Sequence, residues 1–303
     1  MSGGAPASGG ASPPPTADTA AFPFAPREVP LTAGRMRYVS EGDGPPILFV
    51  HGTPTWSFDW RRLIAAFRGR FRCVAPDLLG FGRSERPAGF AYTPEAHATA
   101  LAEFVERVGL RDFTLVVHDF GGPIGLPLAL RDASPVKRLV VINTWMWSLA
   151  GDSFYENGGR VAKSALGRFL YRRANLSLRV ITPGAYGDRK KLTPAIHRQL
   201  LERFPDPASR GLVLWPLAKA LIDSSAHYES LWERRDALRR LPALILWGTK
   251  DPAFPPRLLA RWREALPQAE VVEVTGAGHW PHEEEPGKVV AAMEGFFAGQ
   301  PSR

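Results

Sequence analysis

Short segments rich in apolar and β-branched residues alternate with segments of helical periodicity over most of this 303-residue chain. Such alternation is typical of a mostly parallel sheet whose strands are joined by crossover helices. The predicted strands cover residues 35–40, 46–50, 72–75, 113–117, 138–142, 243–247 and 270–274. The predicted helices cover residues 60–67, 94–108, 123–131, 256–265 and 286–297. The chain is therefore expected to adopt an α/β fold, with a mostly parallel central sheet flanked by helices.

Residues 145–241 interrupt this alternation. The segment is helical in character, rich in aromatic residues, and contains five prolines. Because the sheet pattern resumes after it, we interpret it as an inserted helical cap, with the core built from residues 28–144 and 242–303. Residues 1–27 are rich in Gly, Ala, Ser and Pro, a composition that favours a disordered leader.

Composition narrows the class of protein. The hydrophobic fraction of 45% and the charged fraction of 22% are those of a globular protein, and no apolar run approaches the roughly 20 residues needed to cross a bilayer. The start of the chain does not resemble a secretory signal. A single cysteine, Cys73, excludes an internal disulfide and lies in an apolar run, so we expect a buried, inert thiol. A cytoplasmic protein without membrane contact is the expectation.

The net charge of +8 raises the question of nucleic acid as a partner. The basic residues are mostly arginines spread along the chain among acidic neighbours, and no nucleic-acid motif accompanies the densest group, at 160–191 in the cap. A solvated arginine-rich surface explains them better, so no nucleic-acid partner is expected.

Ligands of parallel sheets collect at the carboxyl ends of the strands. The polar residues found there in the sequence are His51, Asp77, His118, Asp119, Asn143, Asp251 and His279. They include a candidate nucleophile, a candidate base and a candidate acid in separate loops.

Asp119 occupies the bend of a predicted strand, tight turn and helix, in TLVVHDFGGPIGLPLAL. This is the context of a nucleophile elbow, although Val117 replaces the first glycine of G-x-S-x-G and Asp119 replaces the serine. Asp is also a good helix N-cap, so on its own the residue has two equal interpretations.

His279 follows the last predicted strand, where an elbow enzyme needs its base, and Asp251 follows the preceding strand, where its carboxylate can accept the ring N–H of His279. Separately, a loop histidine and an Asp-Pro turn are unremarkable. Together with Asp119 they give the order nucleophile, acid, histidine, which favours a catalytic role for all three. His282 is expected to be structural.

The HGTP loop follows the first buried strand. The backbone N–H groups of Thr53 and Phe120 are expected to form an oxyanion hole. His51 is expected to be structural within this loop.

Five stretches together make the sequence resemble the haloalkane dehalogenase and epoxide hydrolase branch of the α/β-hydrolase family, over residues 28–297. They are HGTPTWSFDWR, APDLLGFGRSERP, LVVHDFGGPIGL, WGTKDPAF and GAGHWPHEEEP. The resemblance implies Asp119 as nucleophile, Asp251 as acid and His279 as base. It also implies a cap over an apolar pocket and no metal or organic cofactor.

A carboxylate nucleophile suits displacement at sp³ carbon, with formation of an alkyl ester that His279-activated water then hydrolyses. The expected partner is a small apolar organic substrate, and the expected assembly is a monomer or homodimer.

The sequence departs from the dehalogenase pattern where side-chain N–H groups usually hold the halide, because Phe120 and Thr53 occupy those two positions. Losing a charge-assisted hydrogen bond to an anion costs roughly 1.5–3 kcal/mol. The Thr53 hydroxyl is one replacement donor, and Trp145 and Trp147 are further possible contacts. Aromatic packing is the more common role for these two and for Trp215 and Trp232.

Dehalogenation remains the first hypothesis because HGTPTW, FGGPIG and NTWMW match that group best. Epoxide hydrolases use two cap tyrosines, for which the candidates are Tyr155, Tyr171, Tyr186 and Tyr228. A β-lactone decarboxylase of the same branch needs no halide site, whereas Phe120 argues against a fluoroacetate dehalogenase. A catalytically idle binding protein is the alternative from another class, and the intact set of Asp119, His279 and Asp251 argues against it.

Overall fold

An eight-stranded sheet forms the centre of the molecule in the computed structural model, which describes residues 22–299. The strand order is β1-β2-β4-β3-β5-β6-β7-β8. Strand β2 pairs antiparallel with β1 and with β4, and the other neighbouring strands pair parallel. The strands span Arg27–Leu31, Gly34–Glu41, Pro46–Val50, Arg72–Pro76, Phe113–Asp119, Val136–Thr144, Ala243–Gly248 and Glu270–Val274, in order from β1 to β8. Every strand expected from the sequence is present, and the α/β-hydrolase fold is confirmed.

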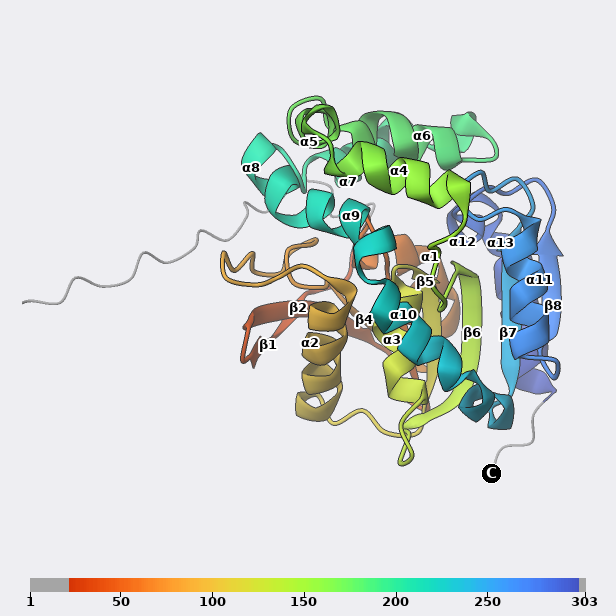
Figure 1. Ribbon diagram of the computed structural model, residues 1–303. Helices are drawn as coiled ribbons and strands as arrows, with labels where there is room; N and C mark the ends of the chain where they lie inside the picture. Colours follow the sequence, from red (N-terminus) through yellow and green to blue (C-terminus); the bar gives the residue numbers. More distant parts are fainter. Residues whose placement is uncertain (1–21, 300–303) are drawn as a thin grey trace, which may run out of the picture.

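Helices cover both faces of the sheet. Figure 1 shows α2 and α3 in front of it, and α1, α12 and α13 behind it. The core helices are α1 (Arg61–Phe67), α2 (Pro94–Arg107), α3 (Gly121–Ala129), α11 (Pro256–Ala265), α12 (Pro281–Glu284) and α13 (Pro286–Ala298), with a 3₁₀ turn, η1, at Ser57–Trp60. Helix α2 begins where the sequence predicts, because the Thr93 hydroxyl accepts from Ala96 N–H.

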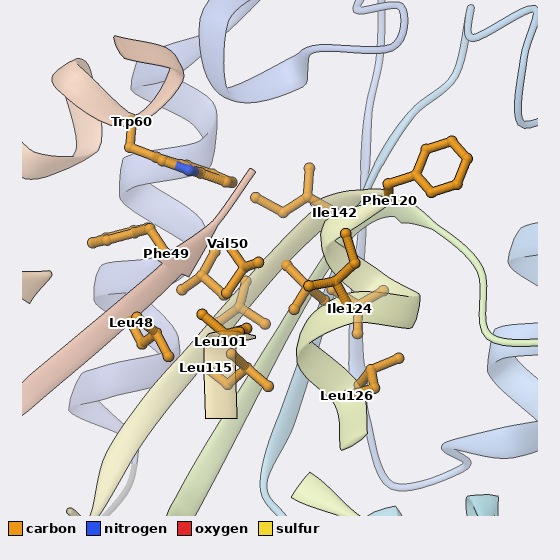
Figure 2. Close-up of a cluster of buried hydrophobic side chains, with 14 of the residues drawn as sticks. Leu48, Phe49, Val50, Trp60, Leu101, Leu115, Phe120, Ile124, Leu126 and Ile142 are labelled. Carbon is orange, nitrogen blue, oxygen red and sulfur yellow. The ribbon is translucent and has the colours of Figure 1, made fainter. Parts of the chain in front are cut away.

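The interior is continuous between the sheet and these helices. All seven residues of β5 are buried, as expected for a strand covered on both faces. Figure 2 shows part of this interior, with Phe49 and Trp60 packed together and Ile124 of α3 facing the sheet. Each such side chain stabilises the fold by about 1.5–3 kcal/mol. Cys73 is buried here, and burial raises the pKa of its thiol to about 12, consistent with an inert residue.

Between β6 and β7 a group of helices lies over the carboxyl ends of the strands (Figure 1). They are α4 (Ser153–Lys163), α5 (Ala165–Arg172), α6 (Thr182–Ala185), α7 (Pro194–Leu201), α8 (Pro207–Ser209) and α9 (Trp215–Asp223). Helix α10 (Ser225–Glu233) then runs back along the front of the sheet beside α3 (Figure 1). Short 3₁₀ segments lie at Arg189–Lys191 (η3) and Arg235–Arg240 (η5). Two π-helical turns, η2 (Ser177–Ile181) and η4 (Arg210–Leu214), were not expected from the sequence.

The first residues that the structure describes differ from the expectation. Phe22 and Phe24 are only 2% and 4% exposed, and Phe22 packs edge-on against Trp56 at 5.1 Å between ring centroids. A disordered leader extending to residue 27 is therefore wrong for residues 22–27, because two aromatic side chains bury enough apolar surface to fix the segment. Residues 1–21 lie outside the described residues. No helix within 22–299 combines the length and apolar character needed to cross a bilayer.

Candidate active site

Asp119 lies at the sharp turn between β5 and α3. Its φ of +52° is left-handed, a conformation that non-glycine residues adopt rarely and often at functional sites. Small neighbours make the turn possible: a Cβ on Gly52 would collide with the Asp119 carboxylate, and a Cβ on Gly122 would collide with the Thr144 hydroxyl. That hydroxyl donates to the backbone carbonyl of Asp119. The packing thus holds the carboxylate above the sheet edge.

His279 lies between two carboxylates. Its Nε2 is 3.4 Å from Asp119 Oδ2, and its Nδ1 is 2.8 Å from Asp251 Oδ2. The backbone N–H of His279 donates to the carbonyl of Ala185, at the end of α6. The three residues singled out in the sequence are therefore brought together, with the histidine in the middle.

Asp251 is fixed by further hydrogen bonds. Asn143 Nδ2 donates to its Oδ2 at 2.8 Å, and Ala253 N–H donates to its Oδ1 at 2.8 Å. Asn143 is itself held by Gly248 N–H, which donates to its Oδ1. The sequence marked Asn143 only as a polar residue after a strand. Its left-handed backbone, with φ of +29°, aims the amide along the sheet edge toward Asp251.

The charges around His279 control its protonation. Burial alone would lower the pKa of the imidazole, but the charge of Asp251 and the hydrogen bonds that the ring donates to both carboxylates raise it to about 10. The pKa of Asp251 is lowered: its burial acts in the opposite direction, but the charge of His279 and hydrogen bonds from His279 and Asn143 outweigh it. Part of the rise for His279 depends on the negative charge of Asp119. Neutralising Asp119 by esterification would therefore lower the pKa of the imidazole toward that of a useful base.

The HGTP loop supplies a hydrogen-bond donor to the Asp119 carboxylate. Thr53 N–H donates to Asp119 Oδ1 at 2.8 Å, while Phe120 occupies the N-cap position of α3. His51 has a structural role, because its Nε2 accepts from Leu78 N–H at 3.0 Å and its Nδ1 contacts Gly52 O at 2.7 Å. Asp77 is structural as well, since it accepts the N–H groups of Ser57 and Arg83.

A cavity of about 600 Å³ lies between the sheet edge and the cap, and Asp119 and His279 line it. Most of its wall is apolar and comes from both core and cap. The apolar members include Phe120, Val161, Leu176, Ile181, Leu214, Leu221, Phe254 and Trp280. Such a cavity has the size and character of a site for a small organic molecule.

Two tryptophans considered as substrate contacts do not line this cavity. Trp145 is fully buried behind the cavity wall, edge-on to Phe120 at 4.9 Å. Trp147 packs against Trp232 and Trp262 at 5.3 and 5.5 Å. Their role is packing, because at the end of β6 both rings point into the interior.

Trp280 is the tryptophan that the sequence reasoning missed. It lines the cavity, is 3% exposed, and its Nε1 has no hydrogen-bond partner among the described residues. Its position directly after His279 was the only available signal.

The cap tyrosines separate into two groups. Tyr155 and Tyr171 line the cavity, whereas Tyr186 and Tyr228 do not. The Tyr155 hydroxyl donates to Ala253 O at 2.6 Å, and the Tyr228 hydroxyl donates to Ala220 O at 2.8 Å. Burial raises the pKa of Tyr171 to about 12.

At the strand ends, His279 contacts two aspartates, Asp119 and Asp251, beneath helices inserted between β6 and β7. This arrangement is typical of α/β-hydrolases. In agreement, residues 45–286 match the family model described as alpha/beta hydrolase fold. The chain is 37% identical over 287 residues to haloalkane dehalogenase 2 of Mycobacterium tuberculosis strain H37Rv, covering 92% of this chain and 96% of that protein. The chain belongs to the α/β-hydrolase fold family, in its haloalkane dehalogenase branch.

Two further comparisons bear on the chemistry and the fold. A cis-3-alkyl-4-alkyloxetan-2-one decarboxylase of Shewanella oneidensis is 29% identical over 284 residues, covering 91% of this chain and 89% of that protein. A haloalkane dehalogenase structure from Agrobacterium tumefaciens C58 superposes with a TM-score of 0.81 at 23% identity, covering 93% of this chain and 99% of that one.

Proposed function

We propose that the protein hydrolyses carbon–halogen bonds of small apolar compounds through a covalent alkyl ester on Asp119. The observation that carries the proposal is the continuous contact from Asp119 through His279 to Asp251, opening on an apolar cavity. The relatives named as haloalkane dehalogenases support the choice of leaving group.

In the first step a carboxylate oxygen of Asp119 attacks the carbon that bears the halogen. A carbon–oxygen bond forms as the carbon–halogen bond breaks, and the halide leaves with the electron pair. His279 is not required as a base here, because the attacking group is already an anion. Its imidazolium, raised in pKa by the two carboxylates, keeps Asp119 ionised and in place.

In the second step water attacks the carbonyl carbon of the ester. Esterification removes the charge of Asp119, so the imidazolium of His279 releases its proton to solvent, which balances the departed halide. The neutral imidazole can then accept a proton from the attacking water. Thr53 N–H, which contacts Asp119 Oδ1, is placed to stabilise the oxyanion of the tetrahedral intermediate, and Phe120 N–H is the second proposed donor. Collapse breaks the bond to the alkyl oxygen, which takes up the proton that His279 accepted from water, and the new carboxyl group returns its remaining proton to His279. The alcohol therefore leaves with an oxygen from Asp119, and one oxygen of the new carboxylate comes from water.

The leaving halide needs donors, and Phe120 supplies none through its side chain. Thr53 and Trp280 are the proposed contacts, because both line the cavity and the Trp280 indole N–H has no other partner among residues 22–299.

Lactone chemistry is the second candidate function. The same missing donor at Phe120 favours it, since ring opening of an oxetan-2-one releases no halide, and a relative carries that decarboxylase name. Epoxide opening is supported less, because the Tyr155 hydroxyl, one of the two in the cavity, already donates to Ala253 O.

The deciding experiment gives the purified protein a 1-bromoalkane, a styrene-oxide-like epoxide and a 3,4-dialkyl-oxetan-2-one in parallel. Halide release, diol and alkene are measured separately. We expect halide release that is lost in Asp119→Ala. Alkene alone would replace the first function by the second, and no product from any substrate would support a binding protein.

A further inference from the structure

Below the sheet edge, a second group of polar side chains lies inside the core. Asp59 comes from η1, His118 from β5 and His282 from α12, so three segments distant in sequence meet there. Asp59 Oδ2 is 3.9 Å from His118 Nδ1 and 3.5 Å from His282 Nε2. All three side chains are buried, with exposed fractions of 6%, 1% and 0%.

The atoms that face one another in this cluster lack hydrogen-bond partners. This holds, within the described part of the chain, for Asp59 Oδ2, His118 Nδ1 and His282 Nε2. Leaving one such atom unsatisfied costs about 1–3 kcal/mol, so three in one place indicate that something binds between them. No step of the proposed hydrolysis uses them.

The protonation of His118 indicates what kind of ligand fits. Its Nε2 contacts the backbone carbonyl of His279 at 2.8 Å. A carbonyl oxygen only accepts, so Nε2 carries the proton and Nδ1 presents a lone pair toward Asp59. Two electron-pair donors, a carboxylate oxygen and a bare ring nitrogen, therefore face each other inside the core. A cation satisfies both at once.

We propose that Asp59, His118 and His282 bind a divalent transition-metal ion of the zinc type. Imidazole nitrogens and a carboxylate oxygen are the ligands such ions prefer, at about 2.0–2.2 Å. Ligand atoms around a tetrahedral ion are then about 3.4 Å apart, close to the 3.5 Å between Asp59 and His282 and a few tenths of an ångström inside the 3.9 Å to His118. A water with hydrogen bonds of about 2.8 Å would hold its partners about 4.6 Å apart, farther than either distance.

The surroundings of His118 match those of a structural metal site, whereas Nδ1 of His282 has no hydrogen-bond partner among residues 22–299. A ligating histidine usually donates its other N–H to a carbonyl or carboxylate, as His118 does to His279. The His282 ring is stacked on Trp60, with centroids 4.6 Å apart and planes inclined by 22°, which fixes its orientation. The carboxylate of the neighbouring Glu283 forms ion pairs with Arg61 and Arg62.

Such an ion would support the catalytic elements without taking part in the reaction. His118 precedes Asp119 in β5 and holds the carbonyl of His279, while Asp59 and His282 anchor the segments that follow the HGTP loop and the base. The family resemblance implies no metal or organic cofactor, and a structural ion departs from that expectation. The ion is independent of the proposed substrate, because no step of the proposed hydrolysis uses it.

The test is metal content and thermal stability of the full-length protein. After dialysis against a picolinate chelator, protein is equilibrated with zinc chloride, passed over a desalting column and analysed by plasma mass spectrometry. We expect about one ion per chain, a Tm that rises with zinc concentration, and visible d–d bands when cobalt(II) replaces zinc. Asp59→Asn and His282→Gln should each lower the occupancy at least tenfold.

His97→Gln is the matched control, because His97 is a fully buried histidine in α2 whose ring nitrogens have no partner among residues 22–299, away from the cluster. It should keep the ion. Should either cluster variant fail to fold, the zinc dependence of Tm in the wild-type protein decides. A wild-type protein that retains less than about a tenth of an ion per chain with an unchanged Tm overturns the proposal, as does full occupancy in both cluster variants.

Discussion

The sheet edge and the cap differ in the polarity and the burial of their side chains. At the edge, Asp119, His279 and Asp251 are buried and connected, each in contact with the next and with backbone or Asn143. The cap, in contrast, exposes large apolar side chains to solvent. Those that are at least 45% exposed are Phe154, Val161, Leu166, Phe169, Val180 and Ile181. Three of these, Phe154, Val161 and Ile181, also line the cavity. In the proposed function, the edge selects the bond that is attacked and the cap selects the molecules that reach it.

The largest effect should come from breaking the edge itself. Asp119→Ala should abolish turnover and adduct, with a loss of about ten-thousand-fold or more, because the variant lacks the carboxylate that forms the alkyl ester in the proposed reaction. His279→Phe should allow the first step and stop the second. Intact mass spectrometry should then show the alkyl group on Asp119. Normal turnover in Asp119→Ala would reject the nucleophile.

A smaller loss of activity is expected when a residue that positions Asp251 is changed and the reacting groups are kept. Asn143→Ala removes the amide that holds Asp251 Oδ2, so the carboxylate can turn away from His279. We expect kcat to fall about ten- to a hundredfold with KM nearly unchanged, the effect of misplacing a catalytic group. Asn157→Ala, an asparagine in the cavity wall on α4, is the control and should keep kcat within about twofold. Equal losses in both variants would count against the positioning role.

The same contrast explains what the sequence could predict. Strand ends and turn residues are local features, so β5, the elbow at Asp119 and the order of acid and base were visible in the sequence. The partners of these residues are not local. Asn143 reaches Asp251 across 108 positions, and nothing in its neighbourhood in the sequence specifies that contact. Trp145 and Trp280 show the same difficulty at the cavity, because composition reveals aromatic residues but not which of them line it.

Changing the cap should alter substrate selection and leave the chemistry intact. Val161→Phe enlarges a side chain in the cavity wall on α4. We expect kcat/KM for long alkyl substrates to fall several-fold, about 1 kcal/mol, while short substrates lose less than twofold. If kcat/KM fell equally for all alkyl chain lengths, the substitution would be acting on the reaction at Asp119 and not on substrate selection.

Burying a titratable side chain makes the stability of the core depend on pH, and His97 is such a side chain. Burial lowers its pKa from 6.5 to about 3, so the folded state keeps it neutral where the unfolded chain binds a proton. Its share of stability is full above pH 6.5 and falls as pH drops, by about 1.4 kcal/mol per pH unit down to pH 3. His97→Phe should therefore lose less stability than wild type between pH 6.5 and 4.5 in urea unfolding. At pH 7 the variant should be at least as stable, since neither ring nitrogen has a partner among residues 22–299.

The least sensitive positions should be the exposed apolar residues of α5. Leu166 and Phe169 are 63% and 58% exposed, and neither lines the cavity. Leu166→Ser and Phe169→Ser should therefore change the free energy of unfolding by about 0.5 kcal/mol or less, because little apolar surface is lost from the interior. Leu101→Ser, at a fully buried site in α2, should cost several kcal/mol in the same urea titration. A loss at Phe169 comparable to that at Leu101 would mean that the outer face of α5 is covered in solution, and the contrast between a buried edge and an open cap would then fail at this helix.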